Sequence, residues 1–508
     1  MERVTPFLRQ TRIFVFACAA LVFAILVAFA PSLSHPFMSD DYHVLAALAG
    51  PSWNARLFFT GNGLYLIPVT KLLWVVQFVL FGTDARGYHF VSLLLHLTNS
   101  ALVVLFFTRL FQSRWSGLLT GAFFALSASH WRTAMWMSAQ MKMLAAFFLL
   151  IGLLAFLAYL RTGKPKFLIA LLIAQAGMPF ASALGIELPL VLASLYLFFR
   201  YTGEKRLRAS VQQVWWLIGS LFVLCAVYLC LQRILYAHSN VYLLSGNGAR
   251  AGLVNLLHAG QWMTLGLFEG FGHSMTGYFI GANPAIFSLR GAAVPATMRL
   301  VPLGLLLILL LLPRRAGWWK RAALFAAWAV LLYAPPIFPD IAQGYTTDWF
   351  VTRARYFYVP AIPVAVLLTV LLTSVRPHRK RPALRRGLTV VSMLFGIMVL
   401  LGNMAHISSL ESNAAAFTKG FAVARDAYVH DLRTLLGNTW GTRVLTITDA
   451  PMGQTTGFDY AGHNVLPSHL AQIYLTPAER ASFRFLPEGV PADYAVSMNG
   501  SLRWTGGR

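Results

Sequence analysis

The chain has 508 residues, of which 57% are hydrophobic and 11% are charged, and it carries a net charge of +24. Because soluble domains carry about 25% charged residues, this composition excludes a soluble globular protein and indicates an integral membrane protein. The positive charge does not indicate nucleic-acid binding, since the basic residues lie in short clusters between apolar stretches, the pattern of membrane topology signals.

The first predicted element is a transmembrane helix over the 18 residues Ile13–Ala30, with the N-terminus in the cytoplasm. A cleaved signal peptide is the alternative, but signal peptides use a shorter apolar core of about 7–15 residues. Further spans of about 20 residues or somewhat fewer are predicted at 88–110, 115–130, 136–160, 167–183, 185–200, 212–233, 296–313, 321–336, 356–375 and 387–405. The sequence therefore predicts an all-α polytopic membrane protein with about eleven transmembrane helices and its C-terminus outside.

Most Lys and Arg residues lie in the segments that this topology places in the cytoplasm. They are Arg3, Arg9, Arg12, Arg109, Arg114, Arg161, Lys164, Lys166, Arg200, Lys205, Arg206, Arg208, Arg314, Arg315, Lys320, Arg321, Arg376, Arg379, Lys380, Arg381, Arg385 and Arg386. Because cytoplasmic loops of membrane proteins carry such an excess, the distribution supports the predicted orientation.

One apolar stretch, Gly63–Gly82, is not counted as a span. It carries Pro68, Lys71 and Gln77, and a crossing there would invert everything downstream and place the basic clusters outside. We interpret it as an interfacial or re-entrant helix.

The opposite side of the membrane is predicted to carry long loops, at 31–87, 234–295 and 337–355, and a tail. Within the tail, Thr442–Thr448 alternates like a strand, and Asn499-Gly500 separates two alternating segments in Tyr494–Trp504, which favours a hairpin. We therefore expect a transmembrane domain over residues 1–405 and a small extracytoplasmic α/β domain over residues 406–508. The tail either positions an acceptor or caps the membrane domain.

Two adjacent carboxylates, Asp40 and Asp41, follow the first span and open the helix-prone run Met38–Ala49. A carboxylate near a hydrophobic boundary can act as general base for a hydroxyl nucleophile, and a pair can hold a divalent cation through its oxygens. The alternative is helix capping, because carboxylates favour the first turn of a helix. Capping and catalysis can coexist, with one Asp for each.

Other ionisable residues are expected on or near the outer face. They are His43, Arg56, Lys71, His89, His130, Arg132, Lys142, Glu187, Glu269, Arg353 and Arg355. Arg is well suited to phosphate because its guanidinium binds two oxygens at once. Acids with clustered cations outside the membrane therefore indicate sugar transfer from a lipid-linked phosphate, whose leaving group needs charge neutralisation but no general acid.

Several of these residues have a simpler interpretation. Lys142 is explained equally well by snorkelling toward the interface, and Glu187 by solvation at an outer helix end. His43, His89 and His130 lack metal-ligand spacing, and the cysteines Cys18, Cys225 and Cys230 lie in apolar stretches, so neither set predicts a metal site. Arg353 and Arg355 precede an outer helix start, where Arg is unusual, which favours a functional role.

Four stretches of the sequence match motifs of a known family. They are PFMSDDYHVL at Pro36–Leu45, FGTDARGYHFVSLLLHLTNSALVVLF at Phe81–Phe106, HWRTAMWMSAQMKMLAAFFLLIGLL at His130–Leu154 and RARYFYVPAI at Arg353–Ile362. In this order they resemble the GT-C membrane glycosyltransferases. The closest likeness is to the membrane portion of the transmembrane-and-tetratricopeptide O-mannosyltransferases and their bacterial relatives. The resemblance implies the GT-C fold, a polyprenyl-phosphate sugar donor and inverting transfer on the outer face.

The sequence also departs from the family. Arg132 and Gln140 stand where the family has Glu and Arg, Ala354 replaces a Glu, and the family's Ser-Lys-Glu is replaced around 181–183. The residues that carry over from the resemblance are Asp40, Asp41, His130 and Arg355. No 34-residue helical repeats follow the membrane portion.

The leading hypothesis is an inner-membrane glycosyltransferase of bacteria that moves a monosaccharide from a polyprenyl-phosphate donor to an extracytoplasmic protein, glycolipid or polysaccharide. The expected catalytic residues are Asp40 and Asp41, acting as base or as ligands of a divalent metal ion. The expected donor-phosphate ligands are Arg355, Arg353, Arg132 and Lys142, and the expected substrate ligands are His130, His43, Tyr42 and Glu187. The alternatives are a transporter or flippase for a lipid-linked glycan, and a catalytically degenerate member that binds polyprenyl lipids.

Overall fold

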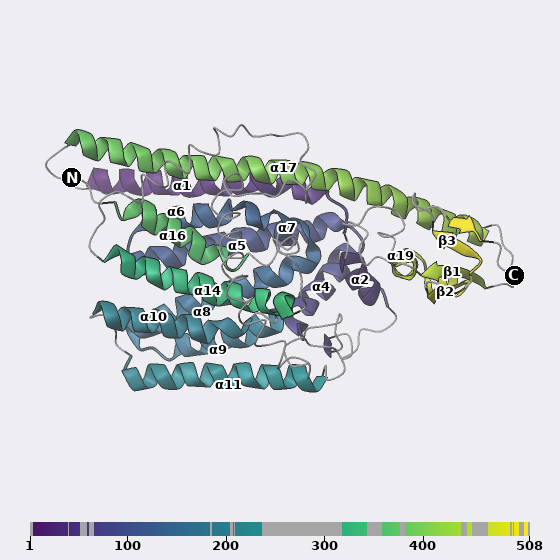
Figure 1. The fold of residues 1–508 in the computed structure, drawn as a ribbon, viewed down its shortest axis with the longest axis horizontal. Helices are drawn as coiled ribbons and strands as arrows, with labels where there is room; N and C mark the ends of the chain where they lie inside the picture. The colour runs from purple at the N-terminus through teal and green to yellow at the C-terminus, as the bar shows by residue number, and fades with distance from the viewer. Residues whose placement is uncertain are drawn as a thin grey trace.

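The computed structural model describes residues 4–38, 40–50, 58–59, 66–182, 185–203, 207, 209–235, 317–342, 358–375, 382–437, 444–449, 466–487, 490, 492–496 and 502–505. Long helices lie side by side in a bundle, and a small sheet lies beyond one end of it (Figure 1). The N-terminus lies at the opposite end of the bundle (Figure 1).

The bundle consists of helices whose positions follow the predicted spans. They are α1 (Val4–Phe29), α5 (Ala85–Phe111), α6 (Arg114–Ala125), α8 (Gln140–Thr162), α9 (Lys166–Ala181), α10 (Leu188–Thr202), α11 (Val211–Leu235), α14 (Trp318–Ala342), α16 (Ala361–Thr373) and α17 (Pro382–Gly437). Every predicted span overlaps one of these helices except 296–313, which lies outside the described residues. The predicted helical architecture is therefore confirmed.

Five segments of the described chain are long and apolar enough to cross a membrane. They are Thr11–Ser34, Ala85–Phe111, Met137–Thr162, Val211–Leu235 and Gly387–Ala405. Shorter apolar helices of 10–17 residues are α4 (Pro68–Phe81), α9, α10 and α16. The number of eleven crossings stays a prediction.

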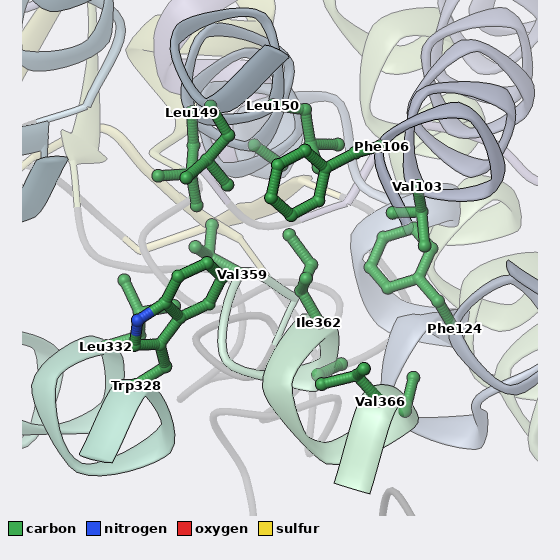
Figure 2. Packing of buried hydrophobic residues seen from close by; sticks show 14 of the residues in the cluster. Val103, Phe106, Phe124, Leu149, Leu150, Trp328, Leu332, Val359, Ile362 and Val366 are labelled. Carbon is green, nitrogen blue, oxygen red and sulfur yellow. The ribbon is translucent and has the colours of Figure 1, made fainter. Parts of the chain in front are cut away.

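A close-packed apolar core joins the central helices (Figure 2). Phe106 of α5, Phe124 of α6, Leu150 of α8, Trp328 of α14 and Ile362 of α16 are all buried in one cluster. Since lipid tails are as apolar as these side chains, such a bundle depends on close packing rather than on hydrophobic burial alone.

Glycines allow α5 and α6 to approach each other closely. A Cβ atom at Gly117 would collide with the side chain of Thr108 and the carbonyl oxygen of Val104, and one at Gly121 would collide with the Val104 side chain. Gly117 and Gly121 are four residues apart and form the small-xxx-small pattern that favours tight helix contacts in membranes.

The outer helices expose large apolar side chains. Phe16 and Phe23 of α1, Trp216 of α11 and Met393 and Leu401 of α17 are all exposed. Because a soluble protein rarely leaves so many apolar side chains in water, these faces fit contact with lipid.

Basic residues from several helix ends meet at the N-terminal end of the bundle. Arg114 lies over the ring of Phe14 at 5.9 Å, and Arg161 donates a hydrogen bond to the carbonyl oxygen of Arg109 at 3.1 Å. Lys320 lies over Tyr201 at 4.3 Å at the same end. The basic clusters that the sequence assigns to one side of the membrane therefore lie together in space.

Helix α4 packs one face onto the bundle at the opposite end. Its Thr70, Lys71, Trp74 and Gln77 are buried, while residues such as Leu80 on its other face are exposed. At 1.5 Å per residue its 14 residues span about 21 Å, less than the hydrocarbon thickness of about 30 Å. This length fits the predicted interfacial or re-entrant helix.

Helix α17 is 56 residues long and runs beside α1 and then beyond the bundle to the sheet (Figure 1). The sheet has the strand order β2-β1-β3-β4, with β1 at Leu445–Asp449, β2 at Phe483–Pro487, β3 at Tyr494–Val496 and β4 at Leu502–Trp504. β1 pairs parallel with β2 and β3, and β3 pairs antiparallel with β4. Two short helices, α19 (Pro467–Tyr474) and α20 (Pro477–Arg480), complete this part.

We call this sheet, α19, α20 and the part of α17 beyond Ala405 the C-terminal unit. Strand β1 overlaps the predicted strand at 442–448, and β3 and β4 pair as the predicted hairpin requires. The Asn499-Gly500 turn lies outside the described residues. Strand β2 was not predicted, and the boundary at 405/406 stays a prediction, because α17 crosses it without a break.

Candidate functional site

The acidic pair opens a short helix, α2 (Asp40–Leu48), at the end of the bundle that faces the C-terminal unit (Figure 1). Asp40 and Asp41 occupy its first turn, where their charges complement the helix dipole. The two neighbours have different surroundings, since Asp41 is fully buried and Asp40 is partly exposed.

Three hydrogen bonds hold the buried carboxylate of Asp41. Its Oδ1 accepts bonds from the backbone N–H and from the Oγ of Ser138, both at 2.8 Å, and its Oδ2 accepts one from the N–H of Met38 at 3.2 Å. Burial raises the pKa of the Asp41 carboxyl to about 7, against the lowering effect of these bonds. A buried carboxylate needs such donors, so Asp41 fastens α2 to the membrane bundle.

The two oxygens of Asp41 do not fit a divalent metal ion. N–H and O–H donors already point at both of them, and a cation would have to displace these donors. Within the described part of the chain, no group of three or more His, Cys, Asp and Glu side chains comes together around a possible ion. Asp41 is therefore not suited to be a ligand of the predicted metal ion.

Tyr42 and His43, both expected as substrate ligands, face the C-terminal unit. Tyr42 is buried, and its ring packs edge-to-face on Phe421 of α17 at 5.4 Å. The exposed His43 has its Nδ1 3.4 Å from the Nε2 of His469 on α19. Both side chains thus contact other protein side chains rather than an open cavity.

The segment Phe123–Gln140, which links α6 to α8, is buried along its entire length. It contains η2 (Ala128–His130), α7 (Trp131–Met135) and η3 (Met137–Ala139) rather than one continuous helix. Irregular backbone at the end of a membrane bundle requires protein or a polar cavity around it. The guanidinium of Arg132 in this segment lies over the ring of Trp136, 4.9 Å from its centroid.

His130 lies in a polar and aromatic cluster inside the bundle, with its ring 4.5 Å from Tyr358 and 5.3 Å from His96. His96 Nε2 bonds the carbonyl oxygen of Ala125 at 2.9 Å and therefore donates, which leaves its Nδ1 to accept from the Tyr358 hydroxyl at 2.9 Å. Asn99 Nδ2 donates to the same hydroxyl at 3.2 Å.

Within the described residues, Nε2 of His130 has no hydrogen-bond partner. His96, Asn99 and Tyr358 were not among the predicted site residues. They lie in the same stretches that carry the family resemblance. Their position in these stretches was the signal that could have identified them as site residues.

Lys142 of α8 and Glu187 at the start of α10 lie together in the protein interior, with 4% and 3% of their surfaces exposed. Lys142 Nζ donates to the Oγ of Ser182 at 3.2 Å, and the lysine charge acts on the Glu187 carboxylate. Among the described residues, Oε1 of Glu187 has no hydrogen-bond partner. Both simpler interpretations are wrong: Lys142 does not snorkel to the interface, and Glu187 is not merely solvated.

Several predicted residues fall in segments whose structure is not described. Arg353 and Arg355, expected as phosphate ligands, lie outside the described residues, as do Arg56 and Glu269. The predicted residues that the structure describes lie on connected elements at one end of the bundle. They include Asp40, Asp41, Arg132, His130, Lys142 and Glu187.

No family model and no curated protein matches the sequence. Among solved structures, the chain is similar to ArnT from Cupriavidus metallidurans bound to undecaprenyl phosphate, at 13% identity and a TM-score of 0.46, over 95% of this chain and 86% of that one. It is also similar to the Archaeoglobus fulgidus oligosaccharyltransferase in the apo form, at 10% identity and a TM-score of 0.46, over 93% of this chain and 64% of that one.

The same oligosaccharyltransferase tethered to an acceptor peptide gives 11% identity and a TM-score of 0.43. The chain thus spans less than two thirds of the oligosaccharyltransferase. Both proteins are GT-C glycosyltransferases, the superfamily that the sequence motifs resemble. These likenesses describe the course of the chain alone.

Proposed function

We propose that the protein is a membrane glycosyltransferase that moves a monosaccharide from a polyprenyl-phosphate donor to an acceptor on the extracytoplasmic side of the bacterial inner membrane. One observation carries the proposal: Asp41 is bonded to Ser138, so the partly exposed Asp40 is held beside the segment that bears Arg132 and leads into the helix of Lys142. A carboxylate and buried cations at one end of a membrane bundle suit a hydroxyl nucleophile and an anionic lipid headgroup.

The charge distribution supports the predicted orientation. The basic residues of α5, α6, α8 and α14 meet at the N-terminal end of the bundle, and cytoplasmic ends of membrane proteins are rich in Lys and Arg. With that end in the cytoplasm, α2 and the C-terminal unit lie on the extracytoplasmic side.

Asp40 is the group we assign as base. It accepts the proton of the acceptor hydroxyl, and the acceptor oxygen forms a bond to the anomeric carbon while the bond from that carbon to the phosphate oxygen breaks. Attack from the face opposite to the phosphate inverts the anomeric configuration. The negative charge of Asp40 also favours the positive charge that develops on the sugar ring.

The departing polyprenyl phosphate gains negative charge as the bond to the sugar breaks. Arg132 and Lys142 are the described cations that stabilise this charge, and Arg353 and Arg355 stay predicted partners. Neutralised phosphate is a good leaving group, so no general acid is required. Asp41 supports Asp40 by fixing α2 and does not itself contact the substrate.

The acceptor in this proposal is a hydroxyl of a protein, a glycolipid or a polysaccharide. His130 and Glu187 are two of the buried side chains that retain hydrogen-bonding capacity for a sugar or headgroup, because Nε2 of His130 and Oε1 of Glu187 have no hydrogen-bond partner among the described residues. Both are buried, where an unmet polar atom is costly, so a ligand that met either one would gain affinity.

A reconstitution experiment tests this function. The purified protein is placed in vesicles with radiolabelled polyprenyl-phosphate hexoses, and a cell-envelope extract is added outside as the source of acceptor. Glycosyl transfer predicts release of free polyprenyl phosphate together with label in the lipid-insoluble or glycolipid fraction. Movement of the intact labelled lipid across the bilayer, without cleavage, would instead indicate a flippase. Neither reaction, with lipid binding retained, would indicate a degenerate member.

A further inference from the structure

The helix that carries the acidic pair shares one hydrophobic core with the C-terminal unit. From the membrane side this core contains Phe37, Tyr42 and Leu45, and from the C-terminal unit Phe421, Tyr428 and Leu470. Because the two sets bury each other, α2 cannot keep its place independently of α17 and α19.

A polar contact at the start of α2 accompanies this packing. Arg425 of α17 donates from Nη1 to the hydroxyl oxygen of Tyr42 at 3.3 Å. The same guanidinium bonds Asp426 through Nε at 2.8 Å and lies over the ring of Tyr474 on α19, 5.6 Å from its centroid. One arginine thus contacts three elements: α2, α17 and α19.

The burial of Tyr42 makes its hydrogen bond with Arg425 important. The side chain is fully buried, and its ring packs edge-to-face on Phe37 at 6.2 Å and on Phe421 at 5.4 Å. Burial raises the pKa of Tyr42 above its ordinary value, so the phenol stays neutral. A buried hydroxyl oxygen without a donor would be costly, and Arg425 supplies that donor.

The first turn of α2 is therefore held from two sides. Asp41 binds Ser138 of the membrane bundle, and the next residue, Tyr42, binds Arg425 of the C-terminal unit. Asp40 precedes these two residues in the same turn, so the two contacts together fix the backbone from which its carboxylate projects. Displacing a reacting group by about 1 Å can reduce a rate by about 100-fold.

We infer that Arg425 is a positioning residue for sugar transfer, which acts through Tyr42 to hold Asp40 in the orientation that accepts the acceptor proton. The inference rests on the proposed function and gives the C-terminal unit a part in the reaction, although this unit supplies no base. If Arg425 only attached the C-terminal unit to the membrane bundle, its replacement would lower thermal stability without a specific effect on kcat.

The test uses the full-length protein in lipid nanodiscs with the variants R425M, R425K and Y42F. The matched control is R433M, because Arg433 lies on the same helix and donates to the carbonyl oxygen of Tyr474 on α19 at 3.1 Å rather than to a side chain of α2. Steady-state transfer gives kcat and the KM for the donor, hydrogen exchange reports on the amides of residues 40–48, and thermal unfolding reports on global stability.

A positioning role predicts that R425M lowers kcat by about 10- to 100-fold while the donor KM stays unchanged. Exchange of the α2 amides is then expected to accelerate by about tenfold, as in a locally loosened element. Y42F keeps the ring packing and is expected to show the same pattern to a smaller extent. R425K is expected to restore most of kcat, and R433M to match the wild type.

Three results would overturn the inference: equal losses in R425M and R433M, a loss that appears only in thermal stability, or unchanged exchange in α2. Failure of the proposed function has a different signature, because the exchange readout does not depend on activity. If Asp40 proves dispensable while R425M still loosens α2, the assignment of Asp40 as base is wrong. The contact of Arg425 with Tyr42 would then still hold α2 in place.

Discussion

Oδ1 of Asp41 accepts two hydrogen bonds from Ser138, one from its backbone N–H and one from its Oγ, each at 2.8 Å, across 97 residues of sequence. This contact joins the start of α2 to the irregular segment in front of α8. It divides the roles within the acidic pair, because it occupies Asp41 and leaves Asp40 partly exposed. The proposed sugar transfer depends on that division.

Removal of the Ser138 hydroxyl tests the strength of the contact. In S138A the carboxylate keeps the backbone N–H donors but loses one charge-assisted bond, which is expected to cost about 1–3 kcal/mol. The apparent melting temperature in detergent measures this loss. S116A is the control, because it removes a neutral, partly buried bond to Ser113. An equal or larger loss in S116A would contradict the special role of the Asp41 contact.

The pH dependence of stability tests the burial of Asp41. Its pKa is raised from 3.8 to about 7, so the folded protein binds this proton more tightly than the unfolded chain does. The stabilisation is therefore fully present below about pH 4 and is lost as pH rises through about 7. About 3 pKa units correspond to about 4 kcal/mol.

The measurement is the melting temperature of wild type and D41N between pH 4 and 8. The difference between the two curves isolates this carboxyl from all other titrating groups. We expect the melting temperature of D41N to rise relative to that of the wild type as the pH rises. Parallel curves would show that Asp41 does not titrate in this range.

Apolar length and spacing were sufficient to predict most of the helices. The spans coincide with helices because about 20 apolar residues in a row have few other stable conformations in a membrane protein. The length of α17 was not predicted, since its apolar run ends near Ala405 while the helix continues to Gly437. Phe421, Tyr428 and Leu432 recur at helical spacing and were the signal for that continuation.

The site was predicted only in part, for a physical reason. Carboxylates and cations could be picked out because they are rare in an apolar chain, but their partners depend on packing between distant segments. No local pattern links Asp41 to Ser138 or Tyr42 to Arg425. The inward position of Lys142 likewise depends on Ser182 and Glu187, which belong to other elements.

The buried pair of Lys142 and Glu187 predicts a coupled response to mutation. K142M removes the charge that acts on the buried Glu187 carboxyl and the donor to Ser182, and E187Q removes that carboxyl; each is expected to cost about 1–3 kcal/mol of stability. The double variant is expected to lose less than the sum of the single losses, because the two side chains lie together. Melting temperatures of the three variants give the coupling, and additive losses would contradict it.

The same variants test donor binding. Loss of a charge-assisted contact to phosphate is expected to weaken binding by about 1.5–3 kcal/mol, which is about 10- to 100-fold in the donor KM of K142M. If the donor KM stays at the wild-type value, Lys142 does not contact the phosphate.

The orientation of the chain predicts the behaviour of reporter fusions. Alkaline phosphatase, which folds only in an oxidising compartment, is expected to be active when it is fused after Arg508. It is expected to be inactive when it is fused after Gly203, between α10 and α11 at the basic end. The reverse pattern would place α2 in the cytoplasm and exclude an extracytoplasmic reaction.

The most direct test of the central claim is the rate of sugar transfer by D40N. The change keeps the size of the side chain and removes its basicity, and Asn still suits the first turn of a helix. The matched control is D84N, because Asp84 is an exposed carboxylate that caps α5 by accepting from the N–H of Arg86. With insertion and melting temperature unchanged, the account predicts that D40N loses transfer by at least about 100-fold while D84N keeps it. Wild-type transfer by correctly inserted D40N would contradict the account.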